Sequence, residues 1–80
     1  MEVDGYGLDR MDRKILRVIR DFYQGGPIGI EALCATLNED RTTIEDVYEP
    51  FLLKEGLLIR TPRGREISEK AIEHLSKNDY

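Results

Sequence analysis

A hairpin pattern near the carboxyl end constrains the fold of this chain more than any other stretch. Two short runs, Leu57–Arg60 and Arg65–Ser68, flank the segment Thr61–Gly64. Pro62 fixes a backbone angle suited to the start of a turn, and Gly64 accepts the positive φ often needed at its end. The pattern therefore predicts two antiparallel strands joined by a four-residue loop.

The register of this hairpin places two arginines opposite each other. Arg60 faces Arg65 near the tip, and Leu58 faces Ile67 near the body of the domain. Like charges that face each other across two strands repel unless an anion lies beside them. A DNA phosphate would supply that anion, so Arg60 and Arg65 are candidate DNA-binding residues.

Charge is distributed unevenly along the 80 residues. The formal net charge is −4, yet residues 8–23 and 57–67 each carry +2, whereas residues 28–56 carry −5. An acidic total argues against a tight, free-standing nucleic-acid binder. The hairpin is nevertheless one of two basic islands on an acidic chain.

Length and cysteine content bound the class of protein. Eighty residues are enough for one small domain. The single cysteine, Cys34, excludes an internal disulfide and is typical of a reducing compartment. No apolar run approaches the ~20 residues of a membrane-spanning helix, and the acidic N-terminus does not have the pattern of a signal peptide. We therefore expect a cytoplasmic domain.

The segment after Leu8 has the period of an amphipathic helix. Asp9 is expected to cap this helix, and Gly25 or Gly26 with Pro27 to end it. The apolar face comprises Met11, Ile15, Val18, Ile19 and Phe22. The opposite face comprises Arg10, Arg13, Lys14, Arg17 and Arg20. We interpret this basic face as solvated surface, and a second contact for DNA or for an acidic partner remains open.

A longer helical pattern, from Asp40 to Gly56, contains Pro50. The apolar face comprises Ile44, Val47, Tyr48, Phe51 and Leu52, and the outer face comprises Glu45, Asp46 and Glu49. Proline removes a backbone donor and clashes with the preceding turn, so we expect a bend or break at residues 46–50. Three outward carboxylates would be unfavourable in a phosphate-lined groove, so we expect the hairpin rather than this helix to contact DNA.

The remaining segments predict a short strand and two more helices. Ile28 is expected to pair with an edge of the hairpin. Residues 30–37 have helical spacing, and Cys34 on their apolar face is interpreted as a buried small hydrophobe. Ser68 is expected to cap a last helix, with His74 at its surface. The inward residues of that helix are Ala71, Ile72 and Leu75.

The order of these elements is typical of a winged helix. The chain is mainly α with one β-hairpin: a three-helix core with a helix–turn–helix, a two-stranded wing and a C-terminal helix. This domain is expected to span residues 8–76, with a linker at 1–7 and a loose end at 77–80. The sequence contains no phosphate-binding loop, catalytic nucleophile pair or metal-ligand spacing. The chain alone is therefore not expected to be an enzyme or to hold a metal or cofactor.

Two long runs of residues resemble one family. The first is Thr43-Ile44-Glu45-Asp46-Val47-Tyr48-Glu49-Pro50-Phe51-Leu52, and the second is Arg60-Thr61-Pro62-Arg63-Gly64-Arg65. Shorter matches at Leu8-Asp9, Met11-Asp12-Arg13-Lys14, Gly25-Gly26-Pro27, Gly29 and Glu73-His74-Leu75 extend the similarity over nearly all of residues 8–75. The chain thus resembles the C-terminal winged-helix domain of the RuvB family of bacterial Holliday-junction branch-migration ATPases.

The resemblance implies functions that composition does not. Family members are hexameric ring ATPases, in which two domains that use ATP and magnesium precede the winged helix. RuvA recruits the rings of neighbouring subunits to a Holliday junction, and RuvC cuts the junction, in DNA recombination and repair. Arg60 and Arg65 match family positions assigned to DNA binding, and Arg63 lies in the same loop. Because the ATPase domains are missing, we interpret the chain as an excised domain. Glu66 departs from the family pattern and adds a negative charge beside the wing.

The resemblance and the charge map predict weak, sequence-independent binding to the duplex backbone. If Arg60, Arg63 and Arg65 each neutralise one phosphate, log K should fall with log salt at a slope of roughly −2.7. Two alternatives remain open. One is a winged-helix transcription regulator that binds a palindromic site as a dimer. The other is a protein–protein interaction module whose acidic third helix docks on a basic partner.

Overall fold

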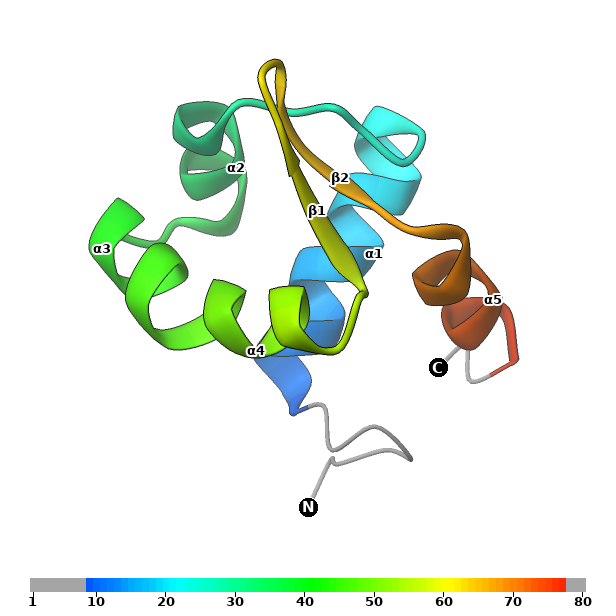
Figure 1. Ribbon diagram of the computed structural model, residues 1–80. Helices are drawn as coiled ribbons and strands as arrows, with labels where there is room; N and C mark the ends of the chain where they lie inside the picture. The colour runs from blue at the N-terminus through cyan, green and yellow to red at the C-terminus, as the bar shows by residue number, and fades with distance from the viewer. Residues whose placement is uncertain (1–8, 78–80) are drawn as a thin grey trace.

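The wing lies between α2 (Ile30–Leu37) and α3 (Arg41–Thr43) on one side and α5 (Glu69–Lys77) on the other (Figure 1). The computed structural model describes residues 9–77, so the expectations for residues 1–7 and 78–80 lie outside it. The elements are α1 (Arg10–Tyr23), α2 (Ile30–Leu37), α3 (Arg41–Thr43), the π-helical turn η1 (Ile44–Tyr48), α4 (Glu49–Lys54), β1 (Leu58–Thr61), β2 (Gly64–Ile67) and α5 (Glu69–Lys77). Figure 1 shows the β1–β2 hairpin crossing in front of α1, with α2 and α3 to one side and α5 to the other. The predicted winged helix is confirmed.

One continuous hydrophobic core joins these elements. Its buried members are Ile15, Leu16, Val18, Ile19, Ile28, Ile30, Leu33, Cys34, Leu37, Ile44, Leu52, Leu57, Leu58, Ile67, Ala71 and Leu75. Every helix and strand of the described range except the short α3 contributes to it. In the same part of the chain, no helix is long and apolar enough to cross a membrane.

Helix α1 begins as the sequence predicts. Asp9 accepts a hydrogen bond from the Asp12 backbone N–H at 2.9 Å, and the Asp12 carboxylate accepts one from the Asp9 N–H at 3.2 Å. This reciprocal capping box satisfies two backbone donors that the first turn leaves free. The helix ends at Tyr23, and Gln24 follows in the left-handed conformation with φ 53°.

The buried face of α1 is wider than predicted, because α2, β2 and α5 all contact this helix. Leu16 is fully buried although it lies outside the predicted apolar stripe, and Arg13 is only 5% exposed. The prediction that Arg13 belongs to a solvated basic face is therefore wrong. Phe22, predicted to be inward, is 70% exposed. Tyr23 packs against the core instead, and its hydroxyl forms a 3.1 Å hydrogen bond with the Thr36 hydroxyl.

The predicted bend or break at residues 46–50 is not a break: the helical run from Arg41 to Lys54 is continuous, and its irregularity takes the form of a π-turn. The backbone N–H of Glu49 donates to the carbonyl of Ile44, five residues back, and α4 starts immediately with Pro50 in its first turn. The wider turn rotates the side chains that follow relative to a regular 100° spacing. As a result Val47, predicted to be inward, is 59% exposed, and Glu49, predicted to be outward, is fully buried.

Helix α5 exchanges the predicted roles of two residues. His74 is 9% exposed and Ile72 is 38% exposed, so His74 lies inward and Ile72 outward. The inward stripe is Ala71, His74 and Leu75, which follows the i, i+3, i+4 rule better than the predicted set. Ser68 caps the helix as predicted, since its hydroxyl accepts from the Ala71 N–H at 3.2 Å and donates to the Gly56 carbonyl at 2.7 Å.

Replacing Ser68 by alanine is expected to lower the free energy of unfolding by about 1 kcal/mol, because both hydrogen bonds of the hydroxyl are lost. Urea denaturation followed by circular dichroism measures the change. Ser76→Ala is the matched control, since Ser76 is exposed near the end of the same helix. Equal midpoints for the two variants would show that the cap does not stabilise α5.

Candidate nucleic-acid interface

The wing has the predicted register but a tighter turn. Arg60 pairs with Arg65 and Leu58 pairs with Ile67, as expected. Thr61 also pairs with Gly64, so the connection contains only Pro62 and Arg63 and the predicted four-residue loop is wrong. The Thr61 hydroxyl closes this turn, since it donates to the Gly64 carbonyl at 2.9 Å and accepts from the Arg63 N–H at 3.2 Å.

The segment that follows α1 pairs with the edge of β2 that faces away from β1. Ile28 donates its N–H to the Arg65 carbonyl at 2.8 Å and accepts the Arg65 N–H at 2.7 Å, which confirms the predicted pairing of Ile28 with the hairpin. Two glycines permit this close approach. A Cβ on Gly26 would lie 2.6 Å from the Arg65 carbonyl oxygen, and a Cβ on Gly64 would overlap the Ile28 carbonyl. Strand β2 is therefore fixed to the segment between α1 and α2 near the tip of the wing.

A carboxylate of the protein itself lies between the two facing arginines. Arg60 donates from Nε and Nη2 to Oε1 of Glu49, at 3.2 and 2.8 Å. Arg65 donates from Nε to Oε2 of Glu49 at 2.7 Å and from Nη2 to Oε1 at 3.2 Å. The facing arginines do have an anion beside them, as predicted, but Glu49 already fills that role in the free protein. A phosphate is therefore not needed to hold the pair together.

The charged state of Glu49 is stabilised by these contacts. Burial raises the pKa of the Glu49 carboxyl, but hydrogen bonds from Arg65 and Arg60 and their positive charges more than offset this, so the pKa lies below its usual value. The hydrogen bond to Glu49 in turn raises the pKa of Arg65 above its ordinary value. Both partners are therefore ionised at neutral pH, and a fully buried carboxylate is compensated by two guanidinium groups.

The ion-pair network continues from Glu49 along the third helical segment, which comprises α3, η1 and α4. Arg65 also contacts Glu45 at 3.2 Å, and Glu45 contacts Arg41 at 3.1 Å. Arg41 reaches α2 by a further 3.1 Å contact to Glu31. Of the three carboxylates predicted to point outward, Glu45 is therefore paired, Glu49 is buried, and the prediction is correct only for the exposed Asp46.

The three wing arginines differ in their availability to a ligand. The side chain of Arg65 is 13% exposed and is bound to two carboxylates, whereas that of Arg60 is 52% exposed and contacts one. Arg63 is exposed at the turn, and its side chain forms no hydrogen bond or ion pair with any residue of the range 9–77. Of the three wing arginines, Arg63 and the exposed part of the Arg60 guanidinium are therefore the best placed to bind an external anion.

The five basic side chains of α1 differ in exposure, although they were predicted to form one solvated face. Arg10 and Lys14 are exposed, Arg17 and Arg20 are half-buried, and Arg13 is buried within the helical core. Arg20 contacts the carboxylate of Asp21 at 2.6 Å, and this hydrogen bond lowers the pKa of Asp21. Part of the positive charge on α1 is therefore neutralised within the helix.

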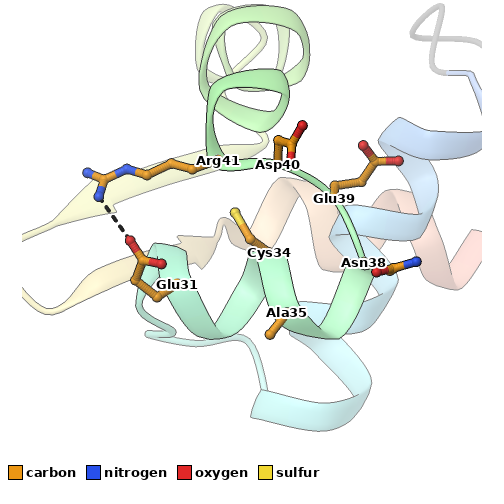
Figure 2. Close-up of a pocket in the computed structure, with 7 residues that line it drawn as sticks. All are labelled: Glu31, Cys34, Ala35, Asn38, Glu39, Asp40 and Arg41. Atoms are coloured by element: carbon orange, nitrogen blue, oxygen red, sulfur yellow. Dashed lines mark hydrogen bonds and ion pairs between the residues drawn. The ribbon is translucent and has the colours of Figure 1, made fainter.

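A small hollow lies between α2 and the start of α3. Its volume is about 360 Å³, and Figure 2 shows its lining: Glu31, Cys34, Ala35, Asn38, Glu39, Asp40 and Arg41. Burial raises the pKa of the Cys34 thiol, and nearby Glu31 raises it further, which disfavours the reactive thiolate. Across residues 9–77, no group of three or more His, Cys, Asp or Glu side chains is placed to hold a metal ion.

Comparison with known proteins identifies one family. The family model for the RuvB C-terminal winged helix domain matches residues 5–76. The Holliday junction branch migration complex subunit RuvB of Flavobacterium psychrophilum is 54% identical over 77 residues, which cover 96% of this chain and 23% of the relative. The same subunit from an Anaeromyxobacter species is 57% identical over 77 residues, covering 96% of this chain and 22% of the relative.

Solved structures give the same relationship. The RuvB Holliday junction branch migration motor of Thermotoga maritima superposes with a TM-score of 0.92 at 52% sequence identity, over 94% of this chain and 25% of that one. A point mutant of the same protein gives a TM-score of 0.91 at 53% identity, over 92% of this chain and 25% of that one. The chain spans about a quarter of the length of the proteins it matches.

Proposed function

The chain belongs to the RuvB C-terminal winged-helix family, and from this premise we propose that its wing contacts the phosphate backbone of duplex DNA. The contact is independent of base sequence, because arginines that bind phosphates position a protein on DNA without reading it. Arg63 and Arg60 make the contact directly, and Arg65 supports it from within the domain.

The observation that carries this proposal is the placement of Arg63. A two-residue turn carries this arginine at the end of a strand pair that Ile28 fixes at Arg65, close to the tip. Arg60 lies one strand pair away and is half exposed. Two guanidinium groups near the tip of the hairpin suit a phosphate backbone, since each can donate two parallel hydrogen bonds to phosphate oxygens.

The third helical segment, α3 to α4, is a poor alternative to the wing for binding phosphates. Of its exposed side chains, Asp46 and Val47 cannot donate a hydrogen bond to a phosphate, and Thr42 offers a single neutral hydroxyl. Arg41, at the start of α3, is engaged by Glu31 and Glu45. The helix that reads the major groove in many helix–turn–helix proteins is therefore poorly equipped to bind phosphates here.

The relatives suggest the setting in which such a contact would act. We propose that the longer protein is a subunit of a Holliday-junction branch-migration complex, in which ATP hydrolysis takes place outside these 80 residues. RuvA, RuvC and neighbouring RuvB subunits are the partners that we propose for that protein, and the bacterial cytoplasm is its compartment. A contact that ignores base sequence suits a motor that moves along any duplex.

Fluorescence anisotropy of labelled duplexes tests the proposal. Binding by the 80-residue chain should be weak, with a Kd of about 0.1 mM or higher at physiological salt, and should be equal for unrelated sequences. Because Arg65 is bound internally, two phosphates rather than three are neutralised, and log K should fall with log salt at a slope of roughly −1.8.

Other results would favour the two rival functions. A strong preference for one palindromic duplex, with binding as a dimer, would indicate a transcription regulator. Absence of any salt-dependent binding, even at about 50 mM salt, would overturn the DNA contact and favour a protein–protein interaction module.

A further inference from the structure

The contact between Glu49 and Arg60 uses only one edge of the guanidinium group. Nε and Nη2 of Arg60 donate to Glu49, whereas Nη1 forms no hydrogen bond within residues 9–77. A guanidinium group carries five N–H donors in a fixed plane, so a second anion can bind along the free edge while the first remains in place. Glu49 and a phosphate can therefore bind Arg60 at the same time.

Glu49 is itself fixed in position. It is fully buried at the junction between the π-turn and α4, and it accepts hydrogen bonds from both Arg60 and Arg65. A rigid carboxylate of this kind limits the rotamers of the long Arg60 side chain before any ligand arrives. It also screens Arg60 from Arg65, which faces it across the hairpin.

We propose that Glu49 is a positioning residue for the phosphate contact, and that it orders the Arg60 guanidinium with its free edge toward the DNA. This inference rests on the proposed function of the wing. Ordering a flexible side chain before binding removes part of the entropic cost of association. The buried carboxylate therefore strengthens binding to an anion, although its own charge opposes that anion.

The two effects of Glu49 have opposite signs, so a neutral replacement separates them. Glu49→Gln adds one positive unit to the net charge and would strengthen duplex binding if charge alone mattered. If positioning dominates, this variant binds duplex DNA about 3- to 10-fold more weakly at low salt, the cost of ordering one or two arginine side chains. Glu66→Gln is the matched control, because Glu66 lies on the same hairpin and its side chain forms no hydrogen bond or ion pair within residues 9–77.

Anisotropy titrations of the wild type, Glu49→Gln and Glu66→Gln on one duplex make the comparison, with circular dichroism to verify folding. The proposal expects Glu66→Gln to bind slightly tighter than the wild type and Glu49→Gln to bind more weakly. Equal or tighter binding by folded Glu49→Gln would overturn it. If the wild type itself shows no salt-dependent binding, the proposed function fails instead, so the two failures are distinguishable.

A measurement on the wild type applies even if Glu49→Gln does not fold. The Nε–H groups of Arg60 and Arg65 should give 15N heteronuclear NOE values as high as those of the helical backbone in the DNA-free protein. Arg63, which has no internal partner in the described range, should give a low value. A low value for Arg60, equal to that of Arg63, would show that Glu49 does not order this side chain and would overturn the proposal.

Discussion

Replacing Arg65 by alanine is expected to lower the free energy of unfolding by about 3 kcal/mol, because Glu49 would keep its burial and lose one of its two cations. Arg65 contributes two hydrogen bonds to this fully buried carboxylate, and Arg60 alone cannot replace them. With a denaturant slope of about 1.5 kcal/mol per molar, the urea midpoint should fall by about 2 M.

Arg63→Ala is the control for this effect. It removes the same charge from the same hairpin, but no internal contact of the described residues is lost, so the free energy of unfolding should change by less than about 0.5 kcal/mol. Combining Arg65→Ala with Glu49→Gln should cost less than the sum of the single changes, because the two side chains share one interaction. Midpoints for Arg65→Ala and Arg63→Ala that agree within error would contradict a stabilising role for the buried network.

The double replacement Arg60→Ala/Arg63→Ala is expected to have the largest effect on DNA binding. It removes the two arginines of the wing that are exposed enough to contact phosphates. Hydrogen bonds to charged groups contribute about 1.5 kcal/mol or more each, so duplex affinity should fall roughly 100-fold at low salt. The slope of log K against log salt should flatten by about 1.8, whatever the base sequence.

A variant with the same net charge separates this local effect from the overall field of the domain. Lys54→Ala/Lys77→Ala also removes two positive charges, from exposed positions at the ends of α4 and α5. This control should weaken binding only slightly and keep the salt slope of the wild type. Equal losses for both double variants would indicate that binding depends on net charge rather than on the wing.

Much of the wing could be predicted from local sequence. The alternation along residues 57–68, with Pro62 and Gly64 between the runs, was sufficient for the pairing of Arg60 with Arg65. The helix caps at Asp9 and Ser68 could also be predicted, since each side chain accepts a hydrogen bond from a backbone N–H only three residues further along the chain. Features of this kind depend on neighbours in the chain, which is why they are accessible without a structure.

The position of Glu49 was not predictable by the same reasoning. A regular helical period placed it outward, but the π-turn that precedes Pro50 rotates it into the domain. Its partners, Arg60 and Arg65, lie 11 and 16 residues further along the chain, so only the folded hairpin brings them to it. One signal in the sequence did point to Glu49. The facing pair Arg60 and Arg65 requires an anion, and Glu49, which directly precedes Pro50, was a candidate for an anion within the protein.

The faces of α1 and α5 illustrate a second limit. An amphipathic pattern predicts one buried stripe, which holds for a helix that is covered from one side. Because α1 is covered by α2, β2 and α5, its buried arc extends to Leu16 and even to Arg13. On α5, His74 completes the i, i+3, i+4 stripe with Ala71 and Leu75, and the prediction of Ile72 failed because it favoured the more apolar residue over the spacing.

The location of the DNA contact can be measured directly by NMR. Titration of the 15N-labelled chain with a duplex of arbitrary sequence should shift the Nε–H signals of Arg60 and Arg63 and the backbone amides of residues 60–65 most strongly. The signals of α3 and η1 should move little, and a second duplex of unrelated sequence should produce the same pattern. The largest shifts on α3 and η1, or a pattern that changes with base sequence, would contradict a wing that holds the phosphate backbone.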